Sequence, residues 1–196
     1  LLVCWCCRCS WCVVVVVTPE SVDGVWPTVT SVQANSLGSA ISVLATDNRS
    51  VREALSDCVF PVEYTLPAAM DSQTQWTTIF AHHLFITRRT IFVLAGTVVP
   101  QHWDARLVAA AQRAGDVVGV APLCVRHPMF SAFSDAAHKP GLAVDEIDQW
   151  LNDYVEGVEF TVPVMLGSCI LLQGDFWPDQ CRRVSSDRLL LAALRN

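Results

Sequence analysis

Two carboxylates occupy positions where a carboxylate can do chemistry. Asp47 follows a short apolar run, 41–45, and open α/β sheets bind ligands at such strand ends. Its carboxylate can accept a hydrogen bond from a nucleobase N–H or a ribose hydroxyl, or it can close an Asx-turn. Asp187 falls in the first turn of the closing segment 185–195. There it can act as a general base, or it can complement the helix dipole after a serine cap.

Histidines offer weaker candidates for a metal site. His82 and His83 are adjacent in an apolar helical segment, and neighbouring helical residues point in different directions, so the pair does not predict one ion. His102 follows Val-Val-Pro and is one candidate metal ligand, and Asp104 is another. A single imidazole replaces a carboxylate poorly as a ligand for a hard cation.

The composition is that of a globular chain with a sizeable core. Of 196 residues, 52% are hydrophobic and 16% are charged, which excludes a disordered or polyelectrolyte segment. Thirteen Lys+Arg against nineteen Asp+Glu give a net charge of −6, and the basic residues are scattered singly or in pairs. We therefore expect no nucleic-acid-binding face.

The cysteines are concentrated at one end of the chain. Of the nine cysteines, those at positions 4, 6, 7, 9 and 12 cluster in the segment 1–12, and the rest are spread through apolar contexts. This distribution favours a reduced, intracellular chain over a framework of disulfides. The segment has three interpretations: a zinc knot, a palmitoylated anchor, or a stretch with no role. Because no second pair of ligands follows this segment, we favour the third and expect 1–12 to lie outside the core.

Short β-branched runs alternate with segments of helical spacing up to residue 121. The run Val13–Val17, stopped by Thr18-Pro19, is typical of a strand buried on both faces. Further strands are predicted at 41–45, 59–64, 91–94 and 117–121. Helices are predicted at 25–34, 50–57 with a Ser-Val-Arg-Glu capping box, 72–87, and 103–114 with Leu107, Ala110 and Ala111 inward. This alternation predicts an α/β fold with a mostly parallel sheet.

The pattern becomes mixed after Pro122. An amphipathic helix is predicted at 144–154, with Asp145 and Glu146 in the first turn, where the helix dipole favours them. Strands are predicted at 158–166 and 168–173, and a closing helix at 185–195. The chain shows no internal repeat, linker or low-complexity stretch, so we expect a single domain from residue 13 onward.

Three segments carry a likeness to a known family. They are Val13–Ser21, a valine-rich strand and its turn; Ile41–Ser50, a strand with an Asp-containing turn; and 90–111, which includes Thr-Val-Val-Pro and a Trp-containing helix start. In order and distance they resemble the family 2 inverting glycosyltransferases of the GT-A fold. The resemblance spans residues 13–196. It implies a Rossmann-like, mostly parallel central sheet with a mixed C-terminal half, in a single GT-A-like domain truncated at its C-terminus.

The resemblance also implies a set of site residues. Asp47 takes the position of the nucleoside-binding aspartate, Asp187 that of the catalytic base, and Gly167 that of the acceptor-side glycine. The turn under the nucleotide consists of Thr18, Pro19 and Glu20.

The chain departs from the family at the metal motif. Where the family places the carboxylate that holds the metal, this chain reads Ala95-Gly96-Thr97, and no Asp or Glu occurs between Asp71 and Asp104. A hard cation needs oxygen ligands, ideally a carboxylate. The family's cofactor, Mn²⁺ or Mg²⁺, thus lacks its carboxylate here, and we assign no metal ligand.

The resemblance implies a hexosyltransferase-type glycosyltransferase. It would move a sugar with inversion from a nucleotide sugar to a carbohydrate or lipid-linked acceptor, as in polysaccharide biosynthesis. The alternative is a non-catalytic GT-A-like domain that keeps the fold but not the metal site. Because such acceptors lie at membranes, we expect a cytoplasmic location at the inner face of the membrane, with membrane association through a longer chain.

Overall fold

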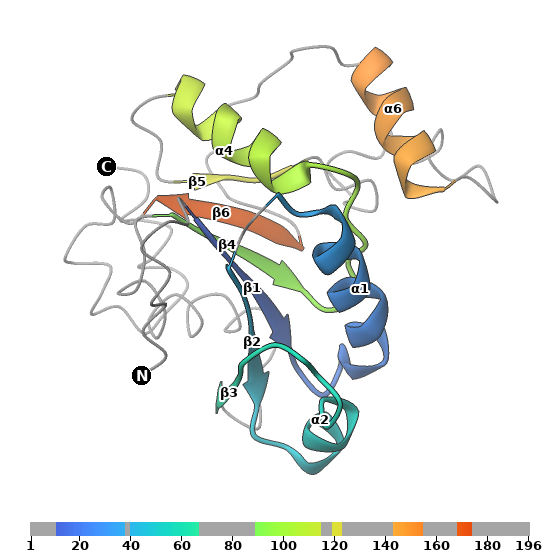
Figure 1. Ribbon diagram of the computed structural model, residues 1–196, viewed down its shortest axis with the longest axis vertical. Coiled ribbons are helices and arrows are strands. Elements are labelled where there is room, and N and C mark those ends of the chain that lie inside the picture. Colours follow the sequence, from blue (N-terminus) through green and yellow to red (C-terminus); the bar gives the residue numbers. More distant parts are fainter. Residues whose placement is uncertain are drawn as a thin grey trace.

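A six-stranded sheet forms the centre of the molecule (Figure 1). The computed structural model describes residues 11–37, 40–66, 89–114, 119–122, 143–154 and 168–173. The strand order is β3-β2-β1-β4-β6-β5. The strands are β1 (Cys12–Val17), β2 (Ala40–Thr46), β3 (Val62–Leu66), β4 (Arg89–Leu94), β5 (Gly119–Val120) and β6 (Cys169–Gln173).

Most of the strand pairs are parallel. β1 pairs in parallel with both β2 and β4, and β2 pairs in parallel with β3. β6 pairs antiparallel with β4 on one side and with β5 on the other. The sheet is therefore mixed but mostly parallel, which confirms the predicted α/β fold class. The mixed character comes from the second half of the chain, as predicted.

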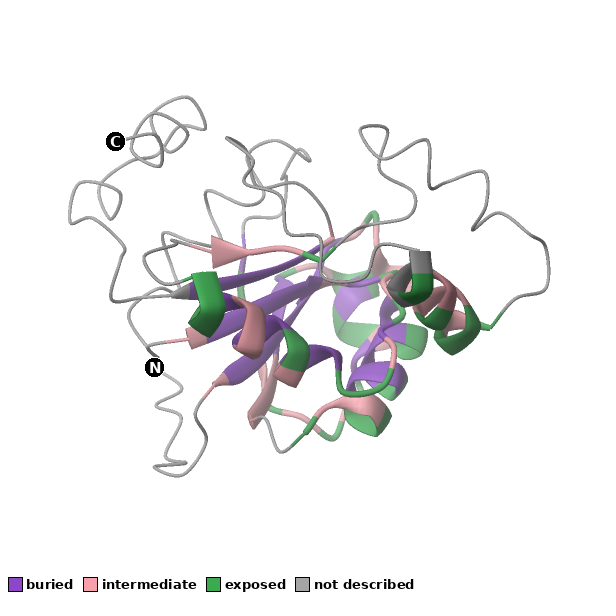
Figure 2. Cartoon of the chain, turned by 90° about the horizontal axis from the view of Figure 1, so that it is seen from above, coloured by how far each residue is buried: buried purple, intermediate pink, exposed green. Residues whose placement is uncertain are grey.

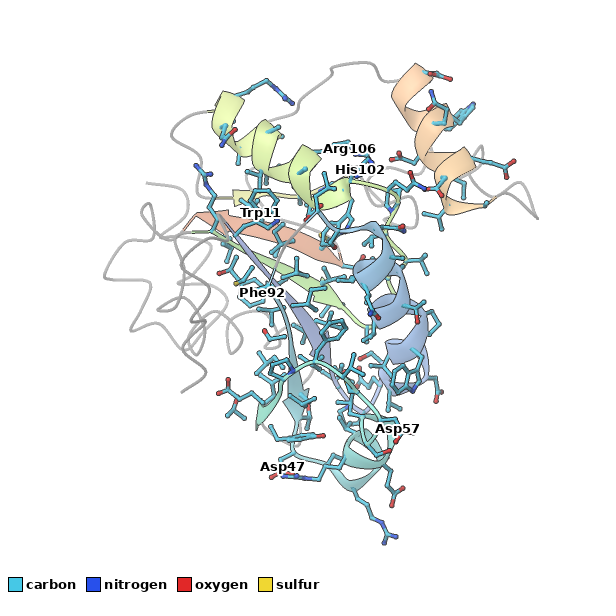
Figure 3. All side chains as sticks on the ribbon, in the orientation of Figure 1. Trp11, Asp47, Asp57, Phe92, His102 and Arg106 are labelled. Atoms are coloured by element: carbon cyan, nitrogen blue, oxygen red, sulfur yellow. The ribbon has the colours of Figure 1, made fainter. Side chains whose placement is uncertain are left out.

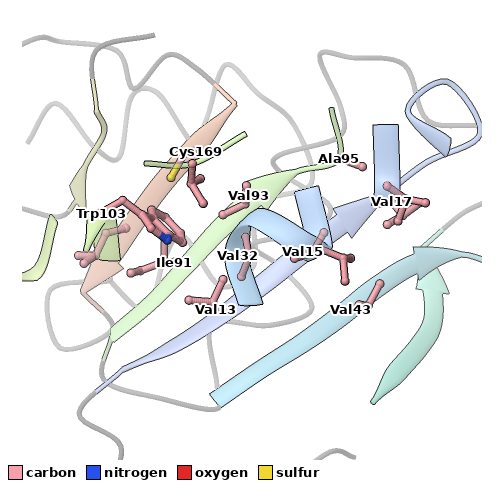
Figure 4. Packing of buried hydrophobic residues seen from close by; sticks show 14 of the residues in the cluster. Val13, Val15, Val17, Val32, Val43, Ile91, Val93, Ala95, Trp103 and Cys169 are labelled. Carbon is pink, nitrogen blue, oxygen red and sulfur yellow. The ribbon is translucent and has the colours of Figure 1, made fainter. Parts of the chain in front are cut away.

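Helices cover one face of this sheet. They are α1 (Val25–Asn35), preceded by the short 3-10 helix η1 (Val22–Gly24), α2 (Arg49–Ala54) and α4 (Trp103–Ala114). The helix α6 (Val144–Tyr154) lies against the beginning of α4 instead. α1 and α4 contribute Val25, Val29, Val32, Leu107 and Ala111, among others, to a core cluster. β1 contributes its alternate residues Val13, Val15 and Val17 to the same cluster (Figure 4).

The second face of the sheet is buried as well. Val14 and Val16 in β1, Leu44 in β2 and Phe92 in β4 are at most 5% exposed, although they alternate with the residues of the core cluster. Figure 2 shows buried residues along the strands and exposed ones on the outer sides of the helices. A strand buried on both faces needs apolar side chains at every position, and the valine run supplies them.

Two predicted elements differ most from the structure in their bounds. The strand predicted at 59–64 begins at Val62 instead, and Val59 is exposed. Pro61 has no N–H to give to a ladder, although its carbonyl accepts from the N–H of Val43, so regular pairing starts after it. The helix predicted at 50–57 spans Arg49–Ala54. The prediction that a capping box starts this helix at Ser50 is wrong, because the N-cap is Asn48. The Asn48 Oδ1 accepts from the N–H of Ser50 at 2.9 Å.

The other described helices agree closely with their predictions. α4 and α6 have the predicted bounds, and α1 ends one residue later than expected. In α4, Val108 is buried with Leu107 and Ala111, whereas Ala110 is only half-buried. The helices predicted at 72–87 and 185–195 and the strand at 158–166 lie outside the described residues.

Two residues of the Cys-rich segment belong to the described part. Cys12 is the first residue of β1 and is buried, and Trp11 packs against the core cluster. The packed structure therefore includes the last two residues of a segment that we expected to lie outside it. Cys12, Cys58 and Cys169 are reduced thiols.

Candidate functional site

The carboxyl ends of three parallel strands meet at one edge of the sheet. In the register of the sheet, Val17 of β1 lies beside Ala45 of β2, and Val16 lies beside Leu94 of β4. The turns that follow the three strands therefore line the same edge, with the end of β1 between the turn that contains Asp47 and the turn that contains Gly96. This confirms the prediction that these two residues share an edge.

The topology also changes direction at this edge. The chain passes from β1 to β2 and β3 on one side, and β4 then returns to the other side of β1. Ligands of open α/β sheets bind in the crevice that forms outside the carboxyl ends of the strands at such a switch point. The edge formed by Thr18, Asp47 and the turn 95–97 is therefore the candidate site, and we call it the carboxyl edge.

The turn after β1 is stabilised by its own hydroxyls. The N–H of Thr18 donates to the Ser21 Oγ at 3.0 Å, and the N–H of Ser21 donates back to the Thr18 carbonyl at 3.0 Å. Thr18 is buried, whereas Pro19 is half-buried and Glu20 is exposed. Of the predicted nucleotide-binding residues, Glu20 is thus open to solvent, and Thr18 serves the turn itself. Sequence reasoning passed over Ser21, although its three-residue spacing from Thr18 is a common turn signal.

Asp47 is paired with a neighbouring arginine at the end of β2. The Arg52 Nε donates to the Asp47 Oδ1 at 2.6 Å, and both side chains are more than half exposed. This hydrogen bond holds the pKa of the Asp47 carboxyl below its ordinary value of 3.8, so the group is ionised at neutral pH. The Arg52 guanidinium also lies over the Tyr64 ring, 4.2 Å from its centroid. Asp47 is therefore an anion held in place by a stacked cation.

The turn 95–97 packs against the start of α1. The N–H of Gly96 donates to the Thr28 Oγ1 at 2.8 Å and lies 3.1 Å from the Gly24 carbonyl. A Cβ built on Gly24 would lie 2.5 Å from the Gly96 Cα, so the two backbones touch. Gly96 has a φ of 95°, which glycine adopts without strain. The β1–α1 connection and the turn after β4 are thus joined at the switch point.

This turn offers no ligand set for a hard cation. Its side chains are a methyl group, a hydrogen and a neutral hydroxyl, and the N–H of Gly96 points at protein oxygens rather than at an anion. Within the ranges that the structure describes, no group of three or more His, Cys, Asp or Glu side chains could hold a metal ion. The residues at this position therefore do not fit Mn²⁺ or Mg²⁺.

A row of polar side chains on α1 fastens the loop 95–102. Thr28, Ser31 and Asn35 share one side of the helix by their spacing. The N–H of Val99 donates to the Ser31 Oγ at 3.3 Å, and the Asn35 Nδ2 donates to the Val99 carbonyl at 2.7 Å. We call Thr28, Ser31 and Asn35 the polar seam. Sequence reasoning missed it, although the three-and-four spacing of polar residues in a valine-rich helix was a readable signal.

His102 lies at the opposite end of α1 from the turn at Gly96. Its N–H donates to the carbonyl of Asn35, the last residue of α1, at 2.9 Å. Because α1 has 11 residues, this point lies about 16 Å along the helix from Gly24. Figure 3 shows His102 and Asp47 far apart. His102 is therefore not placed to replace the missing ligand at the carboxyl edge.

Asp104 is a buried structural carboxylate. It is 0% exposed, and its two oxygens accept from the N–H of Leu37 at 3.0 and 3.1 Å. Its Oδ2 also accepts from the Trp11 Nε1 at 3.1 Å, which ties the residue before β1 to the start of α4. These donors occupy the carboxylate, so Asp104 is not available as a metal ligand at the carboxyl edge.

α6 lies against the beginning of α4. The Arg106 Nη1 donates to the Asp148 Oδ2 at 2.8 Å, and the N–H of Gln101 donates to the Asp145 Oδ1 at 3.2 Å. These contacts are remote from the carboxyl edge and position a helix rather than a site. None of the helices in the described ranges combines the length and apolar character needed to cross a membrane.

The remaining predicted site residues fall outside the described residues. They are Asp187, the predicted catalytic base, and Gly167, the predicted acceptor-side glycine. The same holds for His82 and His83. Their roles stay predictions.

No protein-family model matches the sequence, and no curated protein does either. Among solved structures, the chain is similar to the apo structure of WbbM, a bifunctional glycosyltransferase, with 12% identity and a TM-score of 0.46 over 86% of this chain and 32% of that one. It is also similar to the mannosyltransferase Ktr4p from S. cerevisiae, with 9% identity and a TM-score of 0.38 over 96% of this chain and 61% of that one. The chain thus spans less than two thirds of either protein. The similarity to glycosyltransferases is distant, and it supports no transfer of site residues.

Proposed function

We propose that this chain is the nucleotide-sugar-binding domain of an inverting glycosyltransferase, with the nucleotide at the carboxyl edge. The observation that carries the proposal is the switch point between β1 and β4, where the turns after three parallel strands meet. An ionised carboxylate, Asp47, stands at the same edge. The donor would be a nucleotide sugar, and the acceptor a carbohydrate or a lipid-linked saccharide.

Asp47 is suited to hold a nucleoside. Its Oδ1 accepts from Arg52, while the side chain remains 58% exposed, so a ligand can reach the carboxylate. A carboxylate accepts from a nucleobase N–H or from a ribose hydroxyl, and charged hydrogen bonds of this kind are among the stronger ones in proteins. Arg52 lowers the pKa of the Asp47 carboxyl and fixes the direction of that side chain. Asp47 would thus bind the nucleoside part of the donor.

The chemistry of inversion needs one carboxylate as a base. The acceptor hydroxyl oxygen would attack the anomeric carbon, its proton would pass to the base, and the bond to the nucleoside diphosphate would break on the opposite face of the sugar. By the sequence resemblance Asp187 is this base. A lipid-linked acceptor would bring the domain to the inner face of a membrane through a longer chain.

A second candidate function is a non-catalytic domain of the same fold. The specific observation that favours it is the turn 95–97, which carries no carboxylate and whose Gly96 N–H faces Thr28 and Gly24. Such a domain would keep the nucleotide site but transfer nothing.

Calorimetric titration with UDP and GDP, each with and without Mn²⁺, tests the nucleotide site. We expect Asp47→Ala to weaken binding about 10- to 100-fold, because one charged hydrogen bond to the ligand is lost. Asp57→Ala is the matched control: it removes the same charge from an exposed position after α2, away from Asp47 (Figure 3). Unchanged affinity in Asp47→Ala, or an equal loss in Asp57→Ala, would return Asp47 to the role of a turn residue.

A transfer assay with nucleotide sugars separates the two candidate functions. In an active transferase, Asp187→Asn should slow turnover about 10²- to 10⁴-fold while leaving donor binding intact, because the amide cannot take the acceptor proton. If the wild type binds nucleotide but transfers no sugar, and Asp187→Asn behaves as the wild type does, the non-catalytic domain is the correct interpretation.

A further inference from the structure

The hydroxyl of Thr28 joins two glycine backbones at the switch point. Thr28 is 0% exposed, and its Oγ1 donates at 3.0 Å to the carbonyl of Gly24, the N-cap of α1. The same oxygen accepts from the N–H of Gly96 at 2.8 Å. The first bond is the usual one for a threonine inside a helix. The second reaches the turn after β4 and is the one that connects the two segments.

The contact around Gly96 is tight on one side and open on the other. A Cβ on Gly24 would lie 2.5 Å from the Gly96 Cα and 2.6 Å from its nitrogen, so this side of the turn has no room to move inward. A Cβ on Gly96 itself would meet nothing within 4 Å. The turn therefore packs against the start of α1 on one side and is open on the side where a Gly96 side chain would lie. A glycine there allows a ligand to approach the main chain closely.

We propose that Thr28 is a positioning residue for the ligand at the carboxyl edge. It acts through Gly96: its hydroxyl sets the position of the turn 95–97 relative to α1, and so fixes where a bound nucleotide sugar meets the backbone. This inference rests on the proposed function, and it adds a residue that makes no contact with the ligand itself. With no carboxylate in the turn, the position of its backbone decides how closely the donor can approach.

The polar seam contains its own control. Ser31 is also buried, its Oγ accepts from the N–H of Val99, and it donates to the Thr28 carbonyl at 3.0 Å. Removing either hydroxyl takes a buried hydrogen bond from the same helix–loop contact. Thr28 bonds to Gly96 at the carboxyl edge, whereas Ser31 bonds further along the loop. If both hydroxyls contributed to stability alone, the loss of the Thr28 hydroxyl and the loss of the Ser31 hydroxyl would have the same effect on nucleotide affinity.

The test measures thermal stability and UDP and GDP affinity in Thr28→Val, Thr28→Ser and Ser31→Ala. We expect Thr28→Val to weaken nucleotide binding about tenfold or more, because the turn is no longer held. Thr28→Ser, which keeps the hydroxyl, should restore affinity to within about threefold of the wild type. Ser31→Ala should lower the Tm but leave affinity unchanged. Wild-type affinity in Thr28→Val, or the same loss in Ser31→Ala, overturns the proposal.

Amide hydrogen exchange at Gly96 separates this proposal from the proposed function. If the wild type binds neither UDP nor GDP, the proposed function fails, and exchange then decides only whether Thr28 holds the turn 95–97. If nucleotide does bind, faster exchange of the Gly96 N–H in Thr28→Val than in Ser31→Ala supports the positioning role of Thr28, and equal exchange in the two variants overturns it. Thr28→Ala gives the same comparison if Thr28→Val does not fold.

Discussion

Replacing Asp104 with asparagine changes a buried carboxylate while keeping its shape. In the native protein both carboxylate oxygens accept from the N–H of Leu37, and the Oδ2 also accepts from the Trp11 Nε1. The Oδ1 accepts from the N–H of Ala105 at 2.9 Å. The amide of asparagine keeps one acceptor oxygen, but its NH₂ group replaces the other oxygen and so places a donor opposite these N–H donors. We therefore expect a large loss of stability without a change in side-chain volume.

The magnitude follows from these hydrogen bonds. If the amide oxygen takes the place of the Oδ2, the bonds from Leu37 and Trp11 change from charged to neutral, which weakens each by about 1 kcal/mol. The N–H of Ala105 then faces an NH₂ group and is left without its acceptor, at a cost of about 1 kcal/mol or more. The free energy of unfolding should fall by about 2 to 4 kcal/mol.

Urea denaturation of the wild type, Asp104→Asn and Asp145→Asn measures this loss. Asp145 is the matched control, because it also accepts from a backbone N–H but is exposed, so its replacement should cost less than about 0.5 kcal/mol. Trp11→Phe, which removes one donor, should lose part of its effect when combined with Asp104→Asn. A loss below about 1 kcal/mol in Asp104→Asn would refute the structural role of this carboxylate.

Two further predictions concern α2 and the strand end before it. Asn48→Ala should lower the free energy of unfolding by about 1 kcal/mol, because it removes the N-cap, whereas Ser50→Ala should lower it by less. Chemical denaturation compares the two variants. A larger loss in Ser50→Ala would support the capping box predicted at Ser50 instead. Arg52→Gln should raise the pKa of Asp47 back toward 3.8, as followed by NMR titration of its carboxyl. Since the folded-state pKa of Asp47 is depressed, the ion pair contributes stability above pH 3.8 and loses it as the pH falls through the lower folded value. A wild-type midpoint at or above 3.8 would contradict the pairing.

Residue types alone determined the strands of the parallel half of the sheet. A strand buried on both faces needs an apolar residue at every position, and β1 carries such a run at 12–17. β2 and β4 contain shorter apolar runs, at 43–45 and 91–94. Because parallel strands end at one edge, the positions of Asp47 and Gly96 within two residues of the ends of their strands are sufficient to predict that the two residues share that edge. The helices α4 and α6 were equally readable, since their apolar spacing and first-turn carboxylates are local signals.

Tertiary packing decided the roles of the individual polar groups. Asp104, a candidate metal ligand by type, is occupied by donors of Leu37 and Trp11, and Thr28 bonds to Gly96 across a wide gap in sequence. These partners are far apart in the chain, and no spacing rule connects them. A polar side chain has several equivalent hydrogen-bonding choices, and only the packing of α1 against the loop 95–102 and α4 selects among them. Composition and periodicity therefore determined which segments form the sheet and helices, whereas the contacts between those segments determined which polar residues face a ligand and which hold the fold together.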